Sequence, residues 1–371
     1  MHLAGNHGIL EKKKGDRTML HLKPETLALL EDIEKRIDPE TEEDFAAQWH
    51  SFLYGENREE LFRPVRKVRS VPGIAMKRVP INDALNDFEA MLTAQLLEVS
   101  GALNSPHANL AVRANYGTGI LSSLFGAEIF EMPPQLNTLP TTKAFNDTEV
   151  IRSLVEKGMP DLENGFGERV FACGELYREV FSRYPKIEKY VSVYHPDLQG
   201  PLDICELLWG CDMFIAMYEE PELVHAMLSL LTDAYTAFME RWFRLFPCTA
   251  EMNVHWGILR HRGRILLRND SAMNLSPALY REFAAPYDGK LLEHFGGGAV
   301  HFCGRGDHYI GTLCSLPGLY GINMSQPHLN DMETIYRNTV DKGIPLLAFS
   351  AARAEADKGR DGAFHGKMHI S

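Results

Sequence analysis

The spacing of apolar residues changes at about residue 105. Before that point, three segments place apolar residues three and four positions apart, which is typical of amphipathic helices. These segments are 24–37, 42–55 and 82–100. After that point, short apolar runs alternate with segments of helical length, which is the pattern of βα units. We therefore predict an N-terminal helical extension over 1–104 and an α/β domain over 105–371.

Apolar runs in the second part of the chain predict at least seven strands. They lie at 109–117, 189–197, 250–257, 263–270, 298–304, 319–325 and 344–350. Three of the helical segments between them open with start signals, at Pro221, Ser276-Pro277 and Asn330-Asp331. This alternation predicts a (β/α)8 TIM barrel. A doubly wound open sheet is the alternative, but no glycine-rich phosphate fingerprint follows an early strand.

Composition and charge narrow the class of protein. The chain has 371 residues, of which 45% are hydrophobic and 24% charged, so disordered and fibrous architectures are excluded. Lys plus Arg number 38 against 50 Asp plus Glu, a net charge of -12, and this sign disfavours nucleic acid as a partner.

The chain shows no signal for membrane insertion or secretion. No apolar run approaches the roughly 18 residues of a membrane span, and the first residues lack the apolar stretch of a secretory signal. We therefore expect a cytoplasmic protein that acts on a small-molecule substrate. Its six cysteines (173, 205, 211, 248, 303 and 314) are then free thiols or metal ligands.

Polar residues gather where the predicted strands end, and in a barrel these junctions build the active site. The polar junctions are Asn115-Tyr116-Gly117, His195-Pro196-Asp197, His255-Trp256, Asn269-Asp270-Ser271, His301-Phe302-Cys303-Gly304 and Ser325-Gln326. We take Asn115, Tyr116 and His255 as candidate substrate-binding residues. A structural role is the alternative for His255 and His195, as core histidines bonded to the backbone.

His301 and Cys303 give the sharpest chemical signal. Residues two apart on a strand point to the same face, so an imidazole and a thiolate would project together. These are two of the three protein ligands that a catalytic zinc needs. Packing is the alternative explanation, because this spacing also occurs by chance.

Asp197 and Asp270 are the candidate catalytic carboxylates. Each ends an apolar strand and precedes a helix, where a carboxylate could relay a proton or orient a ligand. Helix capping is the alternative for both, and loop closure is a further alternative for Asp270.

An ordered set of motifs resembles the uroporphyrinogen decarboxylase superfamily over about residues 105–350. It consists of DLQGPLDICELLWG from Asp197, NDSAMNLSPALYREFAAPY from Asn269, HFCGRGDHYIGTL from His301 and GINMSQPHLND from Gly321. The resemblance implies a (β/α)8 barrel with its pocket at the carboxyl ends of the strands. The superfamily contains decarboxylases and zinc-dependent methyltransferases that move methyl groups between corrinoid proteins and thiols.

The methyltransferase branch is the closer match. Its members hold zinc with His-x-Cys and a second cysteine near the last strand, and His301 and Cys303 match the first part. The chain has Ala348-Phe349-Ser350-Ala351 at the second place. This leaves His255, His308, His328, Cys314 or a carboxylate as the third ligand.

The resemblance also implies roles around the metal. Zinc would stabilise a substrate thiolate, and a partner protein would carry the corrinoid. Asp197, Asp270 and Gln326 would position the substrate, and Arg305 would bind an anionic group.

Two other functions stay open. True decarboxylases carry an Arg-Gln-Ala-Gly-Arg segment near their start, which this chain lacks, so a metal-free decarboxylase would act on a porphyrinogen or a smaller carboxylic acid without it. A binding protein that has lost catalysis is the third possibility.

Overall fold

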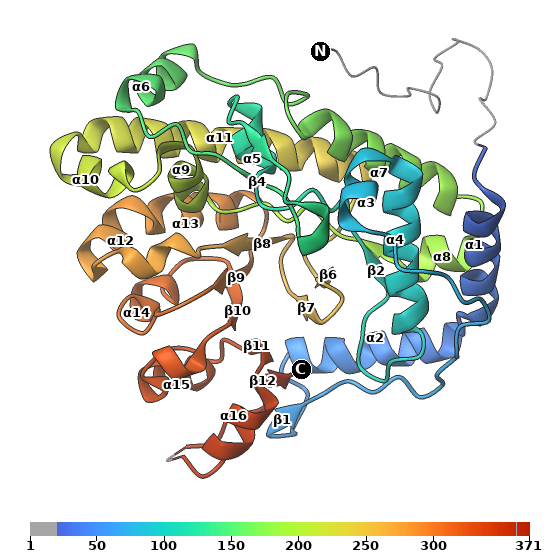
Figure 1. Ribbon diagram of the computed structural model, residues 1–371. Helices are drawn as coiled ribbons and strands as arrows, with labels where there is room; N and C mark the ends of the chain where they lie inside the picture. The colour runs from blue at the N-terminus through green and yellow to red at the C-terminus, as the bar shows by residue number, and fades with distance from the viewer. Residues whose placement is uncertain (1–20, 361) are drawn as a thin grey trace.

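A parallel sheet of six strands organises the structure, a computed structural model that describes residues 21–360 and 362–371 (Figure 1). The strand order is β1-β12-β11-β10-β9-β8, and neighbouring strands are parallel. The strands are β1 (Leu61–Phe62), β8 (Ile265–Arg268), β9 (Gly298–Phe302), β10 (Leu319–Met324), β11 (Leu346–Phe349) and β12 (Met368–Ile370). Two further strands, β2 (Ala111–Val112) and β5 (Ser192–Val193), pair with each other in parallel.

The strands of the sheet are apolar because both of its faces are covered. All five residues of β9 are buried, as are the first three of β8, and such continuous apolar runs are typical of parallel strands. Figure 1 shows α12 to α16 along the outer side of strands β8 to β12. The mixed α/β class predicted from the sequence is therefore confirmed.

Each of the seven predicted strand segments contains a strand, but one is paired differently from the expectation. The segment 250–257 contains β6 (Asn253–His255), which forms an antiparallel hairpin with β7 (Leu259–His261). It is not the first half of a parallel βα unit, because Trp256 and Gly257 turn the chain straight back. Five strands were not predicted, and each has only two or three residues: β1, β3 (Ile129–Phe130), β4 (Thr141–Thr142), β7 and β12.

The first two predicted helices are present, and the third is divided. Helices α1 (Pro24–Arg36) and α2 (Pro39–Leu53) match their predicted segments. Asp87 divides the third segment into α3 (Ile81–Asn86) and α4 (Phe88–Ala102). Its backbone is extended, and its carboxylate accepts a hydrogen bond from the Ala90 backbone N–H, which caps α4.

The remaining α-helices and strands all follow β2 in the chain. They are α5 (Ile120–Leu124), α6 (Thr148–Lys157), α7 (Gly167–Phe181), α8 (Pro185–Tyr190), α9 (Pro201–Trp209), α10 (Asp212–Glu219), α11 (Pro221–Leu245), α12 (Pro277–Phe283), α13 (Ala285–His294), α14 (Ile310–Leu313), α15 (Met332–Asn338), α16 (Ala351–Asp357), β3 (Ile129–Phe130) and β4 (Thr141–Thr142). The strands β3 and β4 pair antiparallel. None of the helices in the described part of the chain is long and apolar enough to cross a membrane.

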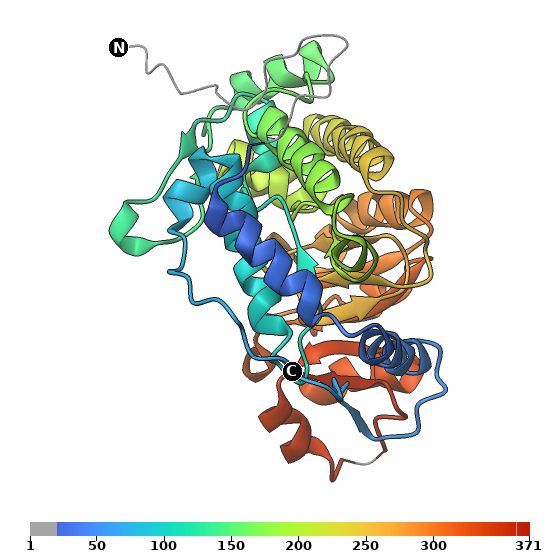
Figure 2. The same ribbon diagram turned by 90° about the vertical axis from the view of Figure 1, so that its right-hand side faces the viewer.

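The segment before residue 105 is packed into the rest of the structure. Helix α1 lies against α4 (Figure 2), and α2 contributes Trp49 and Phe52 to a buried cluster with Leu266 and Leu347 of the sheet. This segment also supplies strand β1. The predicted extension is thus helical over most of its described residues and also contributes one strand to the sheet.

A buried arginine fixes the connection between β1 and α3. The Arg66 guanidinium binds both carboxylate oxygens of Glu42, at 2.7 and 3.0 Å. It also donates to the carbonyl oxygens of Ala102, Ser105 and Ala108. Removing one partner of such a buried pair leaves an uncompensated charge, so Arg66 acts structurally.

Candidate functional site

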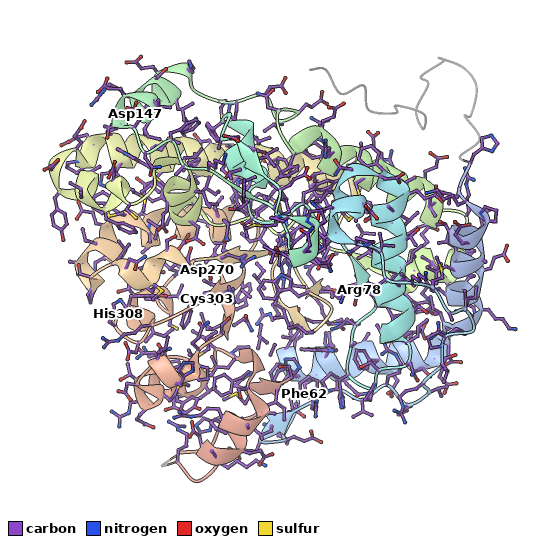
Figure 3. All side chains as sticks on the ribbon, viewed as in Figure 1. Phe62, Arg78, Asp147, Asp270, Cys303 and His308 are labelled. Carbon is purple, nitrogen blue, oxygen red and sulfur yellow. The ribbon has the colours of Figure 1, made fainter. Side chains whose placement is uncertain are left out.

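Asp270, His301 and Cys303 converge at the carboxyl ends of β8 and β9 (Figure 3 labels Asp270 and Cys303). The pairing of Arg268 with His301 across the two strands sets this arrangement. One ligand atom from each of the three lies within 4.8 Å of the others. His301 Nε2 is 3.3 Å from both Asp270 Oδ1 and Cys303 Sγ.

The neighbouring strand fixes the orientation of the His301 ring. Asn323 of β10 donates from Nδ2 to the Leu347 carbonyl oxygen at 2.7 Å, so its Oδ1 faces His301. His301 Nδ1 lies 2.5 Å from that oxygen and must donate to it. Nε2 is therefore the ring nitrogen directed at Asp270 and Cys303, as in metal sites where an outer oxygen fixes the histidine tautomer.

The electrostatics of the cluster favour a cation. Burial lowers the pKa of His301, but hydrogen bonds to Asp270 and Cys303 outweigh it and raise that pKa to about 9. Burial raises the pKa of Asp270, but His301 and Arg268 outweigh it and lower that pKa to about 2. Positive charge is thus stabilised at the point where the three side chains meet, and a metal ion would displace the His301 Nε2 proton that is held there.

The donor set and the adjoining space fit a catalytic zinc. One oxygen, one nitrogen and one sulfur ligand satisfy the preference of zinc for N, S and O donors, and three protein ligands leave a position for substrate. A hollow of about 510 Å³ adjoins the cluster. Its lining comprises Trp256, Ile258, Arg268, His301, Cys303, Asn323, Met324, Ser325, Ala348, Ser350 and Ser371.

Among the five options for a third ligand, the structure brings a carboxylate to His301 and Cys303. The other side chains have different surroundings. His308 Nε2 lies 2.9 Å from the Leu275 carbonyl oxygen, and Cys314 packs against the hydrophobic core. Ala348 and Ser350, where the resemblance led us to look for a second cysteine, line the hollow but supply no sulfur.

Asp197 lies in a second charged cluster beside the first. Its Oδ2 accepts from Arg113 at 2.7 Å, from Arg268 at 3.0 Å and from Trp256 Nε1 at 3.1 Å. Burial opposes its ionisation, but the hydrogen bond from His255 and the two guanidinium charges hold the pKa of Asp197 well below its usual value. Asp197 therefore remains a carboxylate and is suited to orienting its neighbours. Arg268 links the clusters, because it also contacts Asp270 at 3.2 Å.

His255 and His195 lie behind this cluster, in the interior. His255 is fully buried, its Nε2 is 3.5 Å from Asp197 Oδ1, and burial lowers its pKa well below the usual value. His195 donates from Nδ1 to the Pro196 carbonyl and accepts at Nε2 from the Leu266 backbone N–H. The interpretation of His195 as a core histidine bonded to the backbone is confirmed.

The other predicted substrate-binding residues do not share one place. Asn115 lines a second hollow of about 400 Å³, and Tyr116 is fully buried against Phe166. Gln326 Oε1 accepts from the Gly304 backbone N–H at 2.6 Å, which fixes the loop after Cys303. Arg305 is exposed and pairs with Asp307 at 2.8 Å.

Sequence reasoning missed four residues that support the site: Asp203, Arg113, Arg268 and Asn323. Asp203 is buried in α9 and accepts from the backbone N–H groups of Asp270 and Ser271, at 2.9 and 2.8 Å. Burial and the Asp270 charge raise its pKa to about 7. A polar residue inside an apolar strand was the available signal for Asn323.

The fold and the site together define an α/β protein with an O, N, S cluster at the ends of parallel strands. No model of a known protein family matches the chain, and no curated protein sequence matches it. The case for a function therefore rests on the geometry above and on the motifs of the sequence.

Proposed function

We propose that this chain is a uroporphyrinogen decarboxylase-like barrel enzyme that uses zinc to move a methyl group between a corrinoid protein and a thiol. The observation that carries the proposal is the convergence of Asp270, His301 and Cys303 beside a hollow. The superfamily motifs supply the reaction class.

The strand arrangement supports the barrel. The sheet has six strands and the β2–β5 pair two, each parallel to its own neighbours, and eight is the number of strands that a TIM barrel needs. Between β5 and β8, the Gly200 backbone N–H donates to the Arg268 carbonyl at 2.8 Å. Between β1 and β2, the Arg66 backbone N–H donates to the Pro106 carbonyl at 2.7 Å. These contacts lie where the sheet would close, with the strands following one another in chain order.

The residues have separate roles in the proposed reaction. Asp270, His301 and Cys303 would hold the ion, with Asn323 and Asp203 orienting the first two. Bound zinc supplies the charge that keeps a substrate thiol deprotonated at neutral pH. In the proposed transfer, the thiolate sulfur would form a bond to the methyl carbon, the bond between that carbon and the cobalt of the partner's corrinoid would break, and its electron pair would stay on cobalt.

Metal analysis tests the proposal most directly. Protein purified without chelator or affinity tag should contain about one zinc per chain, because a catalytic site binds one ion through three protein ligands. Zinc at less than a tenth of that level, unchanged after zinc is added, would overturn the proposal.

Zinc content and an assay for consumption of a small carboxylic acid together separate the alternatives. A metal-free decarboxylase would consume the acid without zinc, and an inactive binding protein would neither contain zinc nor consume the acid. We expect no coproporphyrinogen from uroporphyrinogen in an anaerobic assay, because the arginine segment for its carboxylates is absent.

A further inference from the structure

Trp256 stands between the two hollows of the site. We propose that it is a specificity-determining residue, a partition that limits the length of the ligand that the metal-side hollow accepts. The inference rests on the proposed function only for placing one end of the ligand at Asp270, His301 and Cys303.

Two hollows share Trp256 and Ile258 in their walls. The metal-side hollow measures about 510 Å³ and contains Cys303, and the far hollow measures about 400 Å³ and contains Arg78. In the view of Figure 3, the β6–β7 hairpin lies between Asp270 and Cys303 on one side and Arg78 on the other. The tip of this hairpin carries Trp256.

The indole is fixed from both sides. Its Nε1 donates to Asp197 Oδ2 at 3.1 Å, and its ring meets the His301 ring edge to face, with centroids 5.1 Å apart. Asp197 in turn binds Arg268 of the metal-side hollow and Arg113 of the far hollow. The wall between the hollows is therefore the indole, and Asp197 connects it to an arginine of each hollow.

The backbone conformation at Trp256 disfavours a bulky residue, so the turn itself does not explain why a tryptophan is present. The Ile258 N–H donates to the His255 carbonyl, and Trp256 and Gly257 between them have φ of 50° and 69°. Positive φ at both central residues is a type I′ turn, which favours Asn, Asp or Gly. A bulky residue there is strained, and such strain persists where the surroundings require the side chain.

The chemistry of the hollows indicates what a longer ligand would carry. The metal-side hollow contains Arg268 and His301. In the far hollow, Arg78 has no ion-pair partner among the residues that the structure describes. Glu98 adds a negative charge to the same hollow. A molecule with a carboxylate at each end could reach Arg268 and Arg78 together if the wall were removed.

The test is isothermal titration calorimetry with malonate, glutarate and pimelate, on zinc-loaded and zinc-free protein. The wild type should bind malonate more tightly than glutarate or pimelate. Glycine and asparagine both suit the positive φ at this position. In Trp256→Gly and Trp256→Asn the affinity for pimelate should rise about tenfold relative to the affinity for malonate, because the two hollows merge. Trp256→Phe keeps an aromatic wall and should keep the wild-type order.

Arg78 gives an independent readout. Arg78→Gln in the Trp256→Gly background should cancel the gain for pimelate and leave malonate unchanged. The partition is overturned if Trp256→Gly and Trp256→Asn keep the wild-type order, if Trp256→Phe behaves like glycine, or if the gain survives loss of Arg78. Zinc measured on the same samples separates a failed metal site from a failed partition, because the order of the ligands is read with and without metal.

Discussion

His301 shows how one side chain can be specified by three strands. Its strand aims the ring, Asn323 of the next strand fixes the tautomer, and the Leu347 carbonyl of the strand after that fixes Asn323. Because Asn323 Nδ2 donates to the Leu347 carbonyl oxygen, Asn323 Oδ1 must accept the hydrogen of His301 Nδ1. The ring therefore presents Nε2 to Asp270 and Cys303 without further adjustment.

Removing either the His301 or the Cys303 side chain should abolish most zinc binding. His301→Ala and Cys303→Ser should each weaken zinc binding by more than the roughly 10–100-fold that loss of an outer partner costs, and the double variant should be hardly worse. Circular dichroism should remain native. The control is Cys314→Ser, which alters a core thiol away from the cluster. Zinc retained by both single variants would contradict the site.

Loss of the outer oxygen should have a smaller effect. Asn323→Ala should weaken zinc binding by about 10–100-fold and change the visible spectrum of the cobalt-substituted protein, because the His301 tautomer is no longer fixed. Ser325→Ala is the matched control on the same strand end, with a longer contact of 3.5 Å to Cys303 Sγ. Equal spectra for the two variants would show that Asn323 does not orient the ring.

At the scale of the element, the longer strands could be predicted from the sequence. The short strands and the register between strands could not, because both depend on how strands pair. The apolar runs at β8 to β11 identify those strands, whereas β1 and β12 are too short for a periodic signal. The same limit applies to the site. The shared face of His301 and Cys303 follows from strand geometry, but Asp270 joins them only through the β8–β9 register, which the sequence does not specify.

The division between α3 and α4 has a local cause that can be tested. Asp87→Ala should destabilise the protein by about 1 kcal/mol, because α4 loses the side chain that caps its N-terminus. Asp87→Asn keeps an acceptor oxygen and should recover most of that stability. Urea unfolding of the two variants measures the difference, and equal loss in both would place the effect elsewhere.

At the scale of the whole molecule, buried histidines make stability depend on pH. Burial lowers the pKa of His195, His255, His261 and His369, to about 4 for His261 and about 3 for His369. The unfolded chain binds their protons near pH 6.5, so stability is lost as pH falls below that value. Asp203 and Asp288 act oppositely, because burial raises their pKa values from about 4 to about 7, and stability from these groups is lost as pH rises between those two values.

His369 allows this dependence to be measured. Its Nδ1 accepts from the Ala348 backbone N–H at 2.8 Å, an acceptor role that the oxygen of His369→Asn can take over without titrating. The pKa of His369 is about 3 in the folded protein and about 6.5 in the unfolded chain. This difference should lower the free energy of unfolding of the wild type by about 2 kcal/mol between neutral pH and pH 5. The variant should therefore lose less stability between pH 7 and pH 5, whereas the exposed control His328→Asn should follow the wild type. Parallel thermal unfolding curves for His369→Asn and wild type at the two pH values would refute this account.

The pairing of β1 with β12 has a consequence for the order of events in synthesis. Leu61 and Phe62 pair with Met368 and His369, and the Phe364 backbone N–H donates to Glu60. A ribosome makes the first of these strands long before the second, so β1 has no partner while almost all of the described chain is still being translated. Trp49, Phe52 and Phe62 form their cluster around His369, so these aromatic side chains cannot complete their packing until His369 has been synthesised. Contacts this distant in sequence form slowly, and until residue 370 has emerged the nascent chain displays apolar surface of the kind that chaperones bind.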